Sequence, residues 1–270
     1  MRIIKVIIGL TLSILLGSGV VVAADFDKGL EAYNSGDFKT ALAEWTPIAE
    51  QGDADAQFNL GLMYENGEGL PENDKTAVKW YTLAAEQGDA KAQSNLGVMY
   101  SDGRGVLEST KTAVKWLTLA AEQGNANAQF NLALRYDKGE GVLENDKTAV
   151  KWFTLAAEQG IVDAQFNLAL RYEKGEGVLE NDKTAVKWFT LAAEQGDAGA
   201  QLNLGVKYVT GAGVLTDNRR AYMWWNIGSY NGNEAAGRNK DKIAKQMTPA
   251  DISKAQDMSS RCLESNYTDC

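Results

Sequence analysis

An internal duplication constrains the fold of this chain more than any other feature of its sequence. Residues 161–196 repeat residues 125–160 with four changes, at Asn125, Ala126, Asn127 and Asp137. The same 36-residue period extends outwards through single positions. Glycine recurs at Gly52, Gly88, Gly124, Gly160, Gly196 and Gly232, and tryptophan recurs at Trp80, Trp116, Trp152, Trp188 and Trp224. A fixed period of this length predicts one supersecondary unit stacked on its own copies, each burying a face that a single unit would leave exposed.

Each unit contains the signals for two helices. In residues 125–160, Ala128, Leu132 and Tyr136 fall on one helical face, and Gly139-Glu140-Gly141 follows, where a helix can end in a left-handed residue. This pattern predicts a first helix of about a dozen residues. Residues 147–158 then predict a second helix with a broad apolar stripe. The stripe consists of Ala149, Trp152, Phe153, Ala156 and Ala157.

The start of the second helix carries a residue with a side-chain oxygen in every unit. We expect these residues to cap the helix, because such an oxygen accepts a hydrogen bond from the first free backbone amides. The expected caps are Asp74, Thr110, Asp146, Asp182 and Asn218. Two such antiparallel helices make a hairpin, and hairpins stacked side by side form an α-solenoid with an extended concave surface. The sequence therefore predicts an all-α fold of stacked antiparallel helical hairpins.

The residues of the unit also carry a family resemblance. The pattern Ala-x-Ala-Gln-x-Asn-Leu-Gly/Ala-x-x-Tyr-x-x-Gly-x-Gly-Val, followed by Lys-Thr-Ala-Val-Lys-Trp-x-x-x-Ala-Ala-Glu-Gln-Gly, resembles the Sel-one-like repeat (SLR) family, a relative of the tetratricopeptide repeats. The resemblance covers residues 53–232 and implies five units, 53–88, 89–124, 125–160, 161–196 and 197–232. Residues 25–52 resemble a shorter hairpin with Trp45 at the place of Phe153, although Glu44 takes the tryptophan position.

Residues 1–24 have the features of a secretory signal peptide. Arg2 and Lys5 precede an apolar run over residues 6–22, and Ala23-Ala24 suit signal peptidase. We expect cleavage after Ala23 or Ala24, no stable membrane insertion afterwards, and export to the periplasm or secretion. The alternative is an uncleaved membrane anchor, because the run approaches the length that spans a bilayer.

The charge of the chain bears on the class of its partners. The full sequence has 27 basic and 36 acidic residues, a formal charge of −9. Residues 1–24 hold two of the bases and none of the acids, so the remainder carries a formal charge of about −11. This charge argues against nucleic acid as a partner. A basic partner and an acidic exterior that is merely solvated are the two interpretations left open.

The C-terminal segment, residues 233–270, is expected to cap the array. Residues 234–247 predict a polar helix, and Thr248-Pro249-Ala250-Asp251 opens a second one that runs to about residue 264. The last unit of a solenoid needs a polar outer face, which such a helix pair supplies. Both cysteines of the chain, Cys262 and Cys270, lie here and predict one disulfide in an exported protein.

The sequence offers little for catalysis. It contains no histidine, which excludes Ser-His-Asp and Cys-His catalysis and every histidine metal site, and we predict no cofactor, no metal and no catalytic residue. Some cysteine-rich SLR proteins are described as penicillin-binding or β-lactam-hydrolysing. This chain has neither a Ser-x-x-Lys motif nor a cysteine pair in each unit.

Three functional hypotheses follow. The leading one is a scaffold or adaptor without enzymatic activity, which binds a protein or peptide in the concave face of the solenoid. A second is an inhibitor that regulates an envelope protein. The third is a cell-wall-active or β-lactam-active enzyme, because acidic residues are plentiful enough to supply a pair of catalytic carboxylates.

We place the binding surface on the first helix of each unit. At about 100° per residue, Asp55, Phe58, Leu62 and Glu65 gather on the face opposite Leu60. The corresponding positions of the other units complete the candidate set: Ser94, Val98, Ser101, Phe130, Leu134, Asp137, Phe166, Leu170, Glu173, Leu202 and Val206. The resemblance to tetratricopeptide proteins implies that this face lines a groove, with aromatic anchors flanked by carboxylates. The alternative is that the phenylalanines pack between adjacent helices.

Overall fold

The structure, a computed structural model, describes residues 24–270, and every regular element within them is an α-helix. The helices are α1 (Phe26–Asn34), α2 (Phe38–Glu50), α3 (Ala54–Asn66), α4 (Asp74–Glu86), α5 (Ala90–Asp102), α6 (Thr110–Glu122), α7 (Ala126–Lys138), α8 (Asp146–Glu158), α9 (Val162–Lys174), α10 (Asp182–Ala193), α11 (Ala198–Thr210), α12 (Asn218–Tyr230), α13 (Glu234–Ala244) and α14 (Pro249–Glu264). The expected signal peptide, apart from Ala24, lies outside the described residues. Within residues 24–270, no helix combines the length and the apolar character needed to cross a bilayer.

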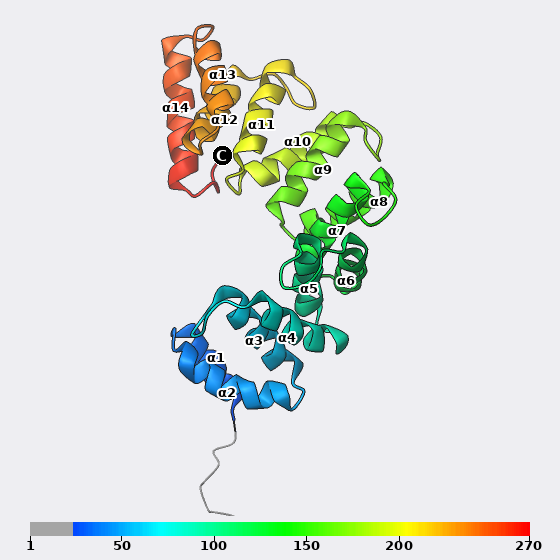
Figure 1. Cartoon of the computed structure of the whole chain (residues 1–270). Helices are drawn as coiled ribbons and strands as arrows, with labels where there is room; N and C mark the ends of the chain where they lie inside the picture. The colour runs from blue at the N-terminus through cyan, green and yellow to red at the C-terminus, as the bar shows by residue number, and fades with distance from the viewer. Residues whose placement is uncertain (1–23) are drawn as a thin grey trace, which may run out of the picture.

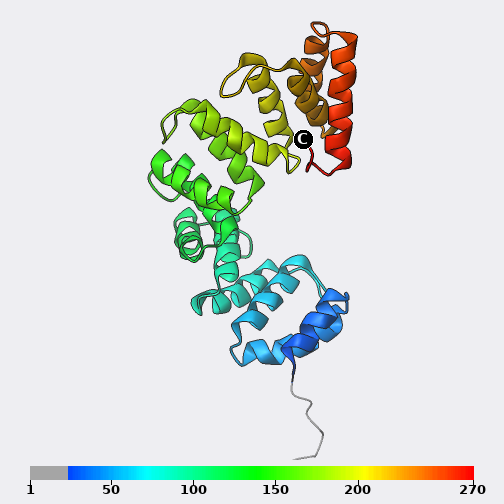
Figure 2. The same ribbon diagram turned by 180° about the vertical axis from the view of Figure 1, so that it is seen from behind.

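Consecutive helices pack against each other from α1 to α13, and α14 packs on α12. The predicted α-solenoid is therefore confirmed, with α1 and α2 as its first, shorter hairpin. We call the first helix of each full unit helix A (α3, α5, α7, α9, α11) and the second helix B (α4, α6, α8, α10, α12). The stack bends into an arch whose two ends face each other across an opening (Figures 1 and 2). In both views α5 and α7 lie toward the opening and α6 and α8 lie on the outer side.

The caps of the B helices lie one residue earlier than the sequence analysis expected. In α8, Oδ1 of Asn145 accepts a 2.9 Å hydrogen bond from the amide of Thr148, and Asp146 is already the first helical residue. Asn145 has the extended backbone that a capping residue requires. The other caps are Asn73, Ser109, Asn181 and Asp217. The expected set of Asp74, Thr110, Asp146, Asp182 and Asn218 is wrong in register.

The Gly-x-Gly motif after each helix A has two structural tasks. Gly139 ends α7 in the left-handed conformation, with φ of 69°, and its amide bonds to the carbonyl of Arg135. Gly141 also has a positive φ, and a Cβ there would lie 2.5 Å from the carbonyl oxygen of Thr110 in the preceding unit. The first glycine thus turns the chain, and the second allows the loop to touch the previous helix B.

The core follows the predicted apolar stripe of helix B. In α8, Ala149, Phe153 and Ala156 are fully buried and Trp152 is 9% exposed. Trp116 is an exception to the buried tryptophans, since it is only half-buried.

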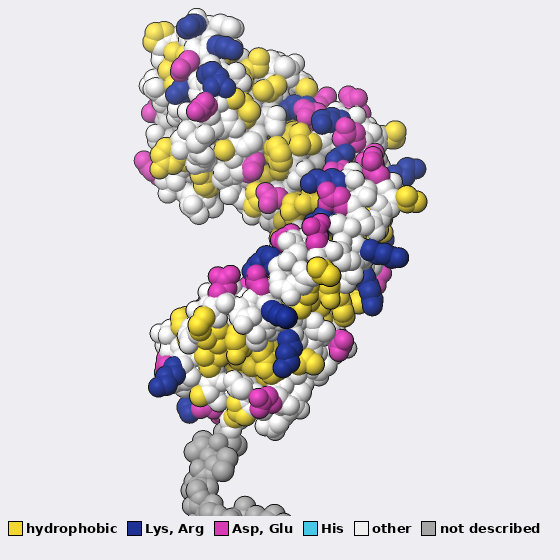
Figure 3. Space-filling model, in the orientation of Figure 1, with side chains coloured by type: hydrophobic (Ala, Val, Ile, Leu, Met, Phe, Trp, Pro, Cys, Tyr) yellow, Lys and Arg dark blue, Asp and Glu magenta, His cyan; other side chains and the backbone are white. Residues whose placement is uncertain are grey.

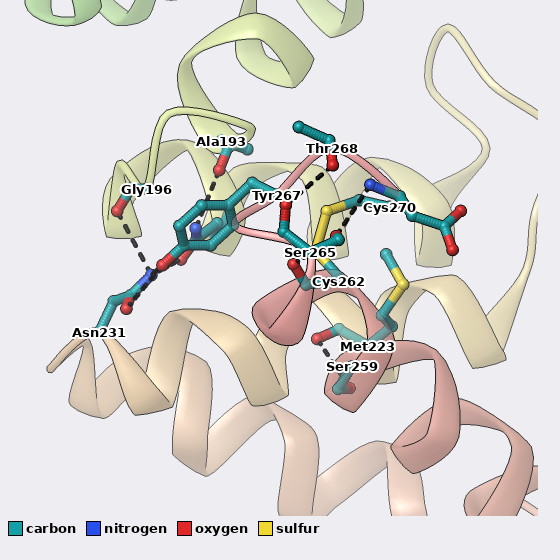
Figure 4. Close-up of a disulfide and its surroundings, with 12 residues drawn as sticks. Ala193, Gly196, Met223, Asn231, Ser259, Cys262, Ser265, Tyr267, Thr268 and Cys270 are labelled. Atoms are coloured by element: carbon teal, nitrogen blue, oxygen red, sulfur yellow. Dashed lines mark hydrogen bonds between the residues drawn. A yellow bond between two sulfur atoms is a disulfide. The ribbon is translucent and has the colours of Figure 1, made fainter.

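Residues 233–270 form the predicted C-terminal helix pair, and the predicted disulfide joins Cys262 to Cys270. Cys262 is buried where α14 packs on α12. The eight-residue separation closes a tight loop that holds Tyr267 in a left-handed conformation. Figure 4 shows the ring of Tyr267 directed toward Asn231, with which its hydroxyl exchanges hydrogen bonds of 3.0 and 3.1 Å. The disulfide therefore fixes a side chain that contacts the last unit.

Candidate functional site

Three phenylalanines form the centre of the candidate surface. Phe58, Phe130 and Phe166 occupy the same position of α3, α7 and α9, and each is half-buried. Each ring lies against an aromatic ring on helix B of its own unit. The partner rings are those of Tyr81, Phe153 and Phe189, at centroid separations of 5.9, 6.0 and 5.9 Å. Each phenylalanine is thus packed within its unit on one side and accessible on another.

The other apolar candidates extend this row. One helical turn further on, Leu62, Val98, Leu134, Leu170 and Val206 are partly exposed, and Val206 reaches 38%. Leu202 takes the phenylalanine position in α11 and is half-buried, whereas Ser94 takes it in α5 and is buried. We name the partly exposed apolar set the helix A strip: Phe58, Leu62, Val98, Phe130, Leu134, Phe166, Leu170, Leu202 and Val206. Figure 3 shows hydrophobic side chains reaching the surface beside the opening of the arch, between acidic and basic ones.

The next helix A approaches two of the phenylalanines, Phe58 and Phe166. Nζ of Lys91 in α5 lies 5.8 Å from the centroid of the Phe58 ring. A Cβ at Gly199 in α11 would lie 3.2 Å from the ring of Phe166. Packing between helices therefore describes one side of the Phe58 and Phe166 rings, and a groove on the other side stays a prediction.

The polar candidates have partners in the following unit. Glu65 accepts hydrogen bonds from the Tyr81 hydroxyl at 2.6 Å and from the Arg104 guanidinium at 2.8 Å. Arg104 also pairs with Asp74 at 2.7 Å. In the last pair of units, Nζ of Lys207 lies 2.7 Å from Glu173 and 2.6 Å from Asp182.

The middle units repeat this arrangement with arginine. Arg135 bonds to Ser101 and Glu140, and Arg171 bonds to Asp137 and lies 2.7 Å from Glu176. Each cation belongs to one unit and reaches a polar group of the unit before it. The expected carboxylates at the flank of the groove are therefore held in the interfaces between units. Of the polar candidates, Asp55 is exposed near the start of α3.

Burial and hydrogen bonding perturb two groups in these interfaces. Burial raises the pKa of the Tyr81 hydroxyl well above its usual range, and the hydrogen bond to Glu65 adds to the rise. Burial by itself lowers the pKa of Lys207, but hydrogen bonds to Asp182 and Glu173 outweigh it, so the pKa of Lys207 is raised. The fold therefore favours the protonated form of both groups.

Sequence analysis missed a second periodic polar feature, a buried glutamine in every helix A. Nε2 of Gln129 donates to the carbonyl of Ala121 at 3.1 Å, and its Oε1 accepts from Nε2 of Gln159 at 2.8 Å. Gln57, Gln93, Gln165 and Gln201 occupy the same position and are likewise buried. The available signal was the recurrence of glutamine beside core alanine at the 36-residue period.

Among residues 24–270, no three His, Cys, Asp or Glu side chains are grouped closely enough to hold a metal ion. The helix A strip is a partly exposed apolar surface, which is suited to contact with another macromolecule.

An array of short helical hairpins with this packing defines an α-solenoid repeat protein. The Sel1 repeat family matches residues 54–89, 90–125, 126–161, 162–197 and 198–233, and the chain belongs to this family. Sel1 repeat proteins generally mediate protein–protein interaction, and their fold is typically a non-catalytic scaffold. The family resemblance noted from the sequence is thus confirmed.

Two solved structures are similar over most of the chain. One is a protective antigen present in uropathogenic Escherichia coli strains that displays an SLR fold. It is 34% identical with a TM-score of 0.80, over 88% of this chain and 54% of that one. The present chain therefore spans about half the length of that protein. The other is a Sel1 repeat protein from Oxalobacter formigenes, 33% identical with a TM-score of 0.76, over 88% of this chain and 99% of that one. No match was found among curated proteins.

Proposed function

We propose that this chain is an exported scaffold or adaptor that binds a protein or a peptide along the helix A strip. The observation that carries the proposal is the register of the strip, since successive units place partly exposed apolar side chains at the same helical positions. A partner laid along the arch would contact several units at once. Many small apolar contacts added along one ligand give an affinity that no single unit provides.

The residue three positions before Phe58 and its equivalents in the other units varies along the array, with aspartate in two units. The positions are Asp55, Lys91, Asn127, Asp163 and Gly199, and all but Gly199 are exposed. Since the rings are similar and their neighbours are not, the strip supplies affinity and the neighbouring residues supply the differences that select a partner. Glu65, Asp137 and Glu173 are already paired with cations, whereas Asp55 and Asp163 are exposed, so recognition combines apolar contact with these exposed polar positions.

Two observations support export. The chain begins with a basic and then apolar segment, and its two cysteines form a disulfide, which persists in oxidising compartments. In that setting the partner is an envelope protein or a secreted protein. Binding by this chain either holds the partner in a complex or inhibits it.

The test is capture of a partner from envelope extracts of the source cells, followed by comparison of variants. Phe130→Ala and Phe166→Ala should each weaken the complex by about 1.5 to 3 kcal/mol, because the exposed side of each ring is buried on binding. The matched control is Phe153→Ala, whose ring is fully buried beneath Phe130.

The control should lower the melting temperature strongly, because a core phenylalanine cut to alanine costs about 3 to 5 kcal/mol. Phe130→Ala should lower it less, since part of its ring is already solvated. If Phe130→Ala melted as early as Phe153→Ala while capture of the partner was unchanged, the strip would be a packing surface and the proposal would be refuted.

A further inference from the structure

The helix A strip begins at an edge of the solenoid that is strongly acidic. The edge is formed by the loops that lead into each helix A, together with the residues on either side of them. We name it the B–A loop edge, and it consists of residues 50–55, 86–91, 122–127, 158–163 and 194–199. It contains ten acidic residues, with at least one in every loop, and a single basic residue, Lys91. The start of the strip therefore lies beside a row of negative charge.

These acids have no counterion among residues 24–270. None of the ten lies in an ion pair of the described chain, whereas Glu65 and Asp137, further along helix A, each pair with an arginine. Asp53, Asp89 and Asp197 accept a backbone amide as helix caps, which satisfies an oxygen but does not neutralise the charge. Carboxylates distributed along an edge in this way are complementary to a ligand that carries several positive charges.

One pair of residues shows how a ring of the strip accommodates a cation. Nζ of Lys91, near the start of α5, lies 5.8 Å from the centroid of the Phe58 ring on the preceding helix A. A cation at this distance from an aromatic face is attracted by the negative charge of the π-electrons. In the same register, Asp163 follows Phe130. The second ring of the strip thus has an acid where the first has a lysine.

Asp163 makes the surroundings of Phe130 receptive to a cation from outside the chain. It is exposed in the first turn of α9. The register that brings Lys91 to Phe58 places Asp163 beside the half-buried ring of Phe130. An aromatic face next to a carboxylate without a counterion provides two attractive contacts for one lysine or arginine side chain.

We propose that the partner of the helix A strip is a cationic segment of a protein. Its apolar side chains lie on the strip, and its lysine or arginine side chains lie toward the B–A loop edge, one of them over Phe130 and paired with Asp163. The inference rests on the proposed function and adds the charge of the partner. The formal charge of about −11 over residues 25–270 acts in the same direction, because it attracts a cationic segment before contact is made.

The test is fluorescence anisotropy of the processed protein with labelled peptides of equal length, which alternate leucine with lysine, with glutamate or with serine. The lysine peptide should bind most tightly and lose affinity as salt is added, and the glutamate peptide should bind least. Asp163→Lys places a cation of the chain itself beside Phe130, so it should weaken binding of the lysine peptide by about tenfold.

The matched control is Glu144→Lys, which makes the same change of net charge at an exposed acid in the loop between α7 and α8. Both variants should melt close to the parent, because both side chains are exposed. A larger loss of affinity for Asp163→Lys than for Glu144→Lys supports the proposal. The proposal is overturned if the lysine peptide does not bind, if the serine peptide binds as tightly, or if the two variants bind equally well.

Phe130→Ala distinguishes failure of this inference from failure of the proposed function. If Phe130→Ala weakens binding of the serine peptide and the lysine peptide has no advantage, the strip binds a partner without preference for charge. The proposed function then stands and the cationic partner is refuted. If Phe130→Ala binds every peptide as tightly as the parent does, the strip is not the binding surface, and both proposals are refuted.

Discussion

Nε2 of Gln159 donates a 2.8 Å hydrogen bond to Oε1 of Gln129, which lies thirty residues earlier in the same unit. Gln129 in turn donates to the carbonyl of Ala121 in the preceding unit. One buried side chain thus connects the end of its own helix B to the end of the previous one. The same pairing joins Gln87 to Gln57, Gln123 to Gln93, and Gln195 to Gln165, and Asn231 replaces the outer glutamine opposite Gln201.

We predict that Gln129→Ala lowers the free energy of unfolding by about 1 to 3 kcal/mol, because it removes both hydrogen bonds of a buried amide. Gln159→Ala is the matched control. Its side chain is exposed and its loss leaves the bond from Gln129 to Ala121 in place, so it should cost less than Gln129→Ala. Urea unfolding followed by far-UV circular dichroism measures both. Equal losses for the two variants would contradict the structural importance of the buried amide.

The tryptophans of helix B give a second prediction. Trp152→Ala should destabilise the fold by about 3 to 5 kcal/mol, through lost burial and the cavity that remains. Trp116 occupies the same position two helices earlier but is only half-buried, so Trp116→Ala should cost less. Differential scanning calorimetry compares the variants. A Trp152 variant that melted with the parent would show that this position is not part of the core.

The elements that could be predicted from sequence are those formed by residues close together in the chain. The apolar stripe of helix B, the glycine that ends helix A and the disulfide between Cys262 and Cys270 all depend on residues close together in the chain, and all are confirmed. The caps were misplaced by one residue because Asn145 and Asp146 both carry suitable oxygens, and only the backbone decides between them.

The contacts between units could not be predicted from the sequence. Arg171 reaches Asp137, thirty-four residues away, because the rotation between stacked hairpins brings them together, and a repeat pattern does not specify that rotation. In α5, Met99 stands where α7 has Arg135, and Arg104 from the following loop supplies the cation instead. The sequence therefore predicts a groove position for Glu65, Asp137 and Glu173, whereas the structure pairs them with cations of the following unit. The binding role of the helix A strip remains a prediction.

The C-terminal disulfide gives a third prediction. Cys270→Ser should destabilise the capping helices by about 2 to 3 kcal/mol, the entropy of closing a short loop. The readout is amide hydrogen exchange in α12 and α14, because Tyr267 contacts Asn231 at the end of α12. Tyr267→Phe keeps the disulfide and should cost only about 1 kcal/mol. Unreduced mass and thiol alkylation check the parent, and two alkylated cysteines in native protein would refute the pairing.

Stability should fall at alkaline pH, because two buried groups between units favour their protonated forms. The pKa of Lys207 and the pKa of Tyr81 are both raised in the fold. A group with a raised pKa contributes its full stabilisation below the pKa of the unfolded chain, about 10 for both residue types, and loses it as the pH rises through the folded pKa. The free energy of unfolding should therefore decline above about pH 10.

The variant Tyr81→Phe tests the contribution of the tyrosine, because phenylalanine cannot ionise. Its free energy of unfolding should be lower than that of the parent at neutral pH, since the hydrogen bond to Glu65 is lost, and should then decline less steeply with pH. Urea titrations between about pH 8 and pH 11 measure the slopes. Identical slopes for the parent, Tyr81→Phe and Lys207→Met would show that neither group is responsible.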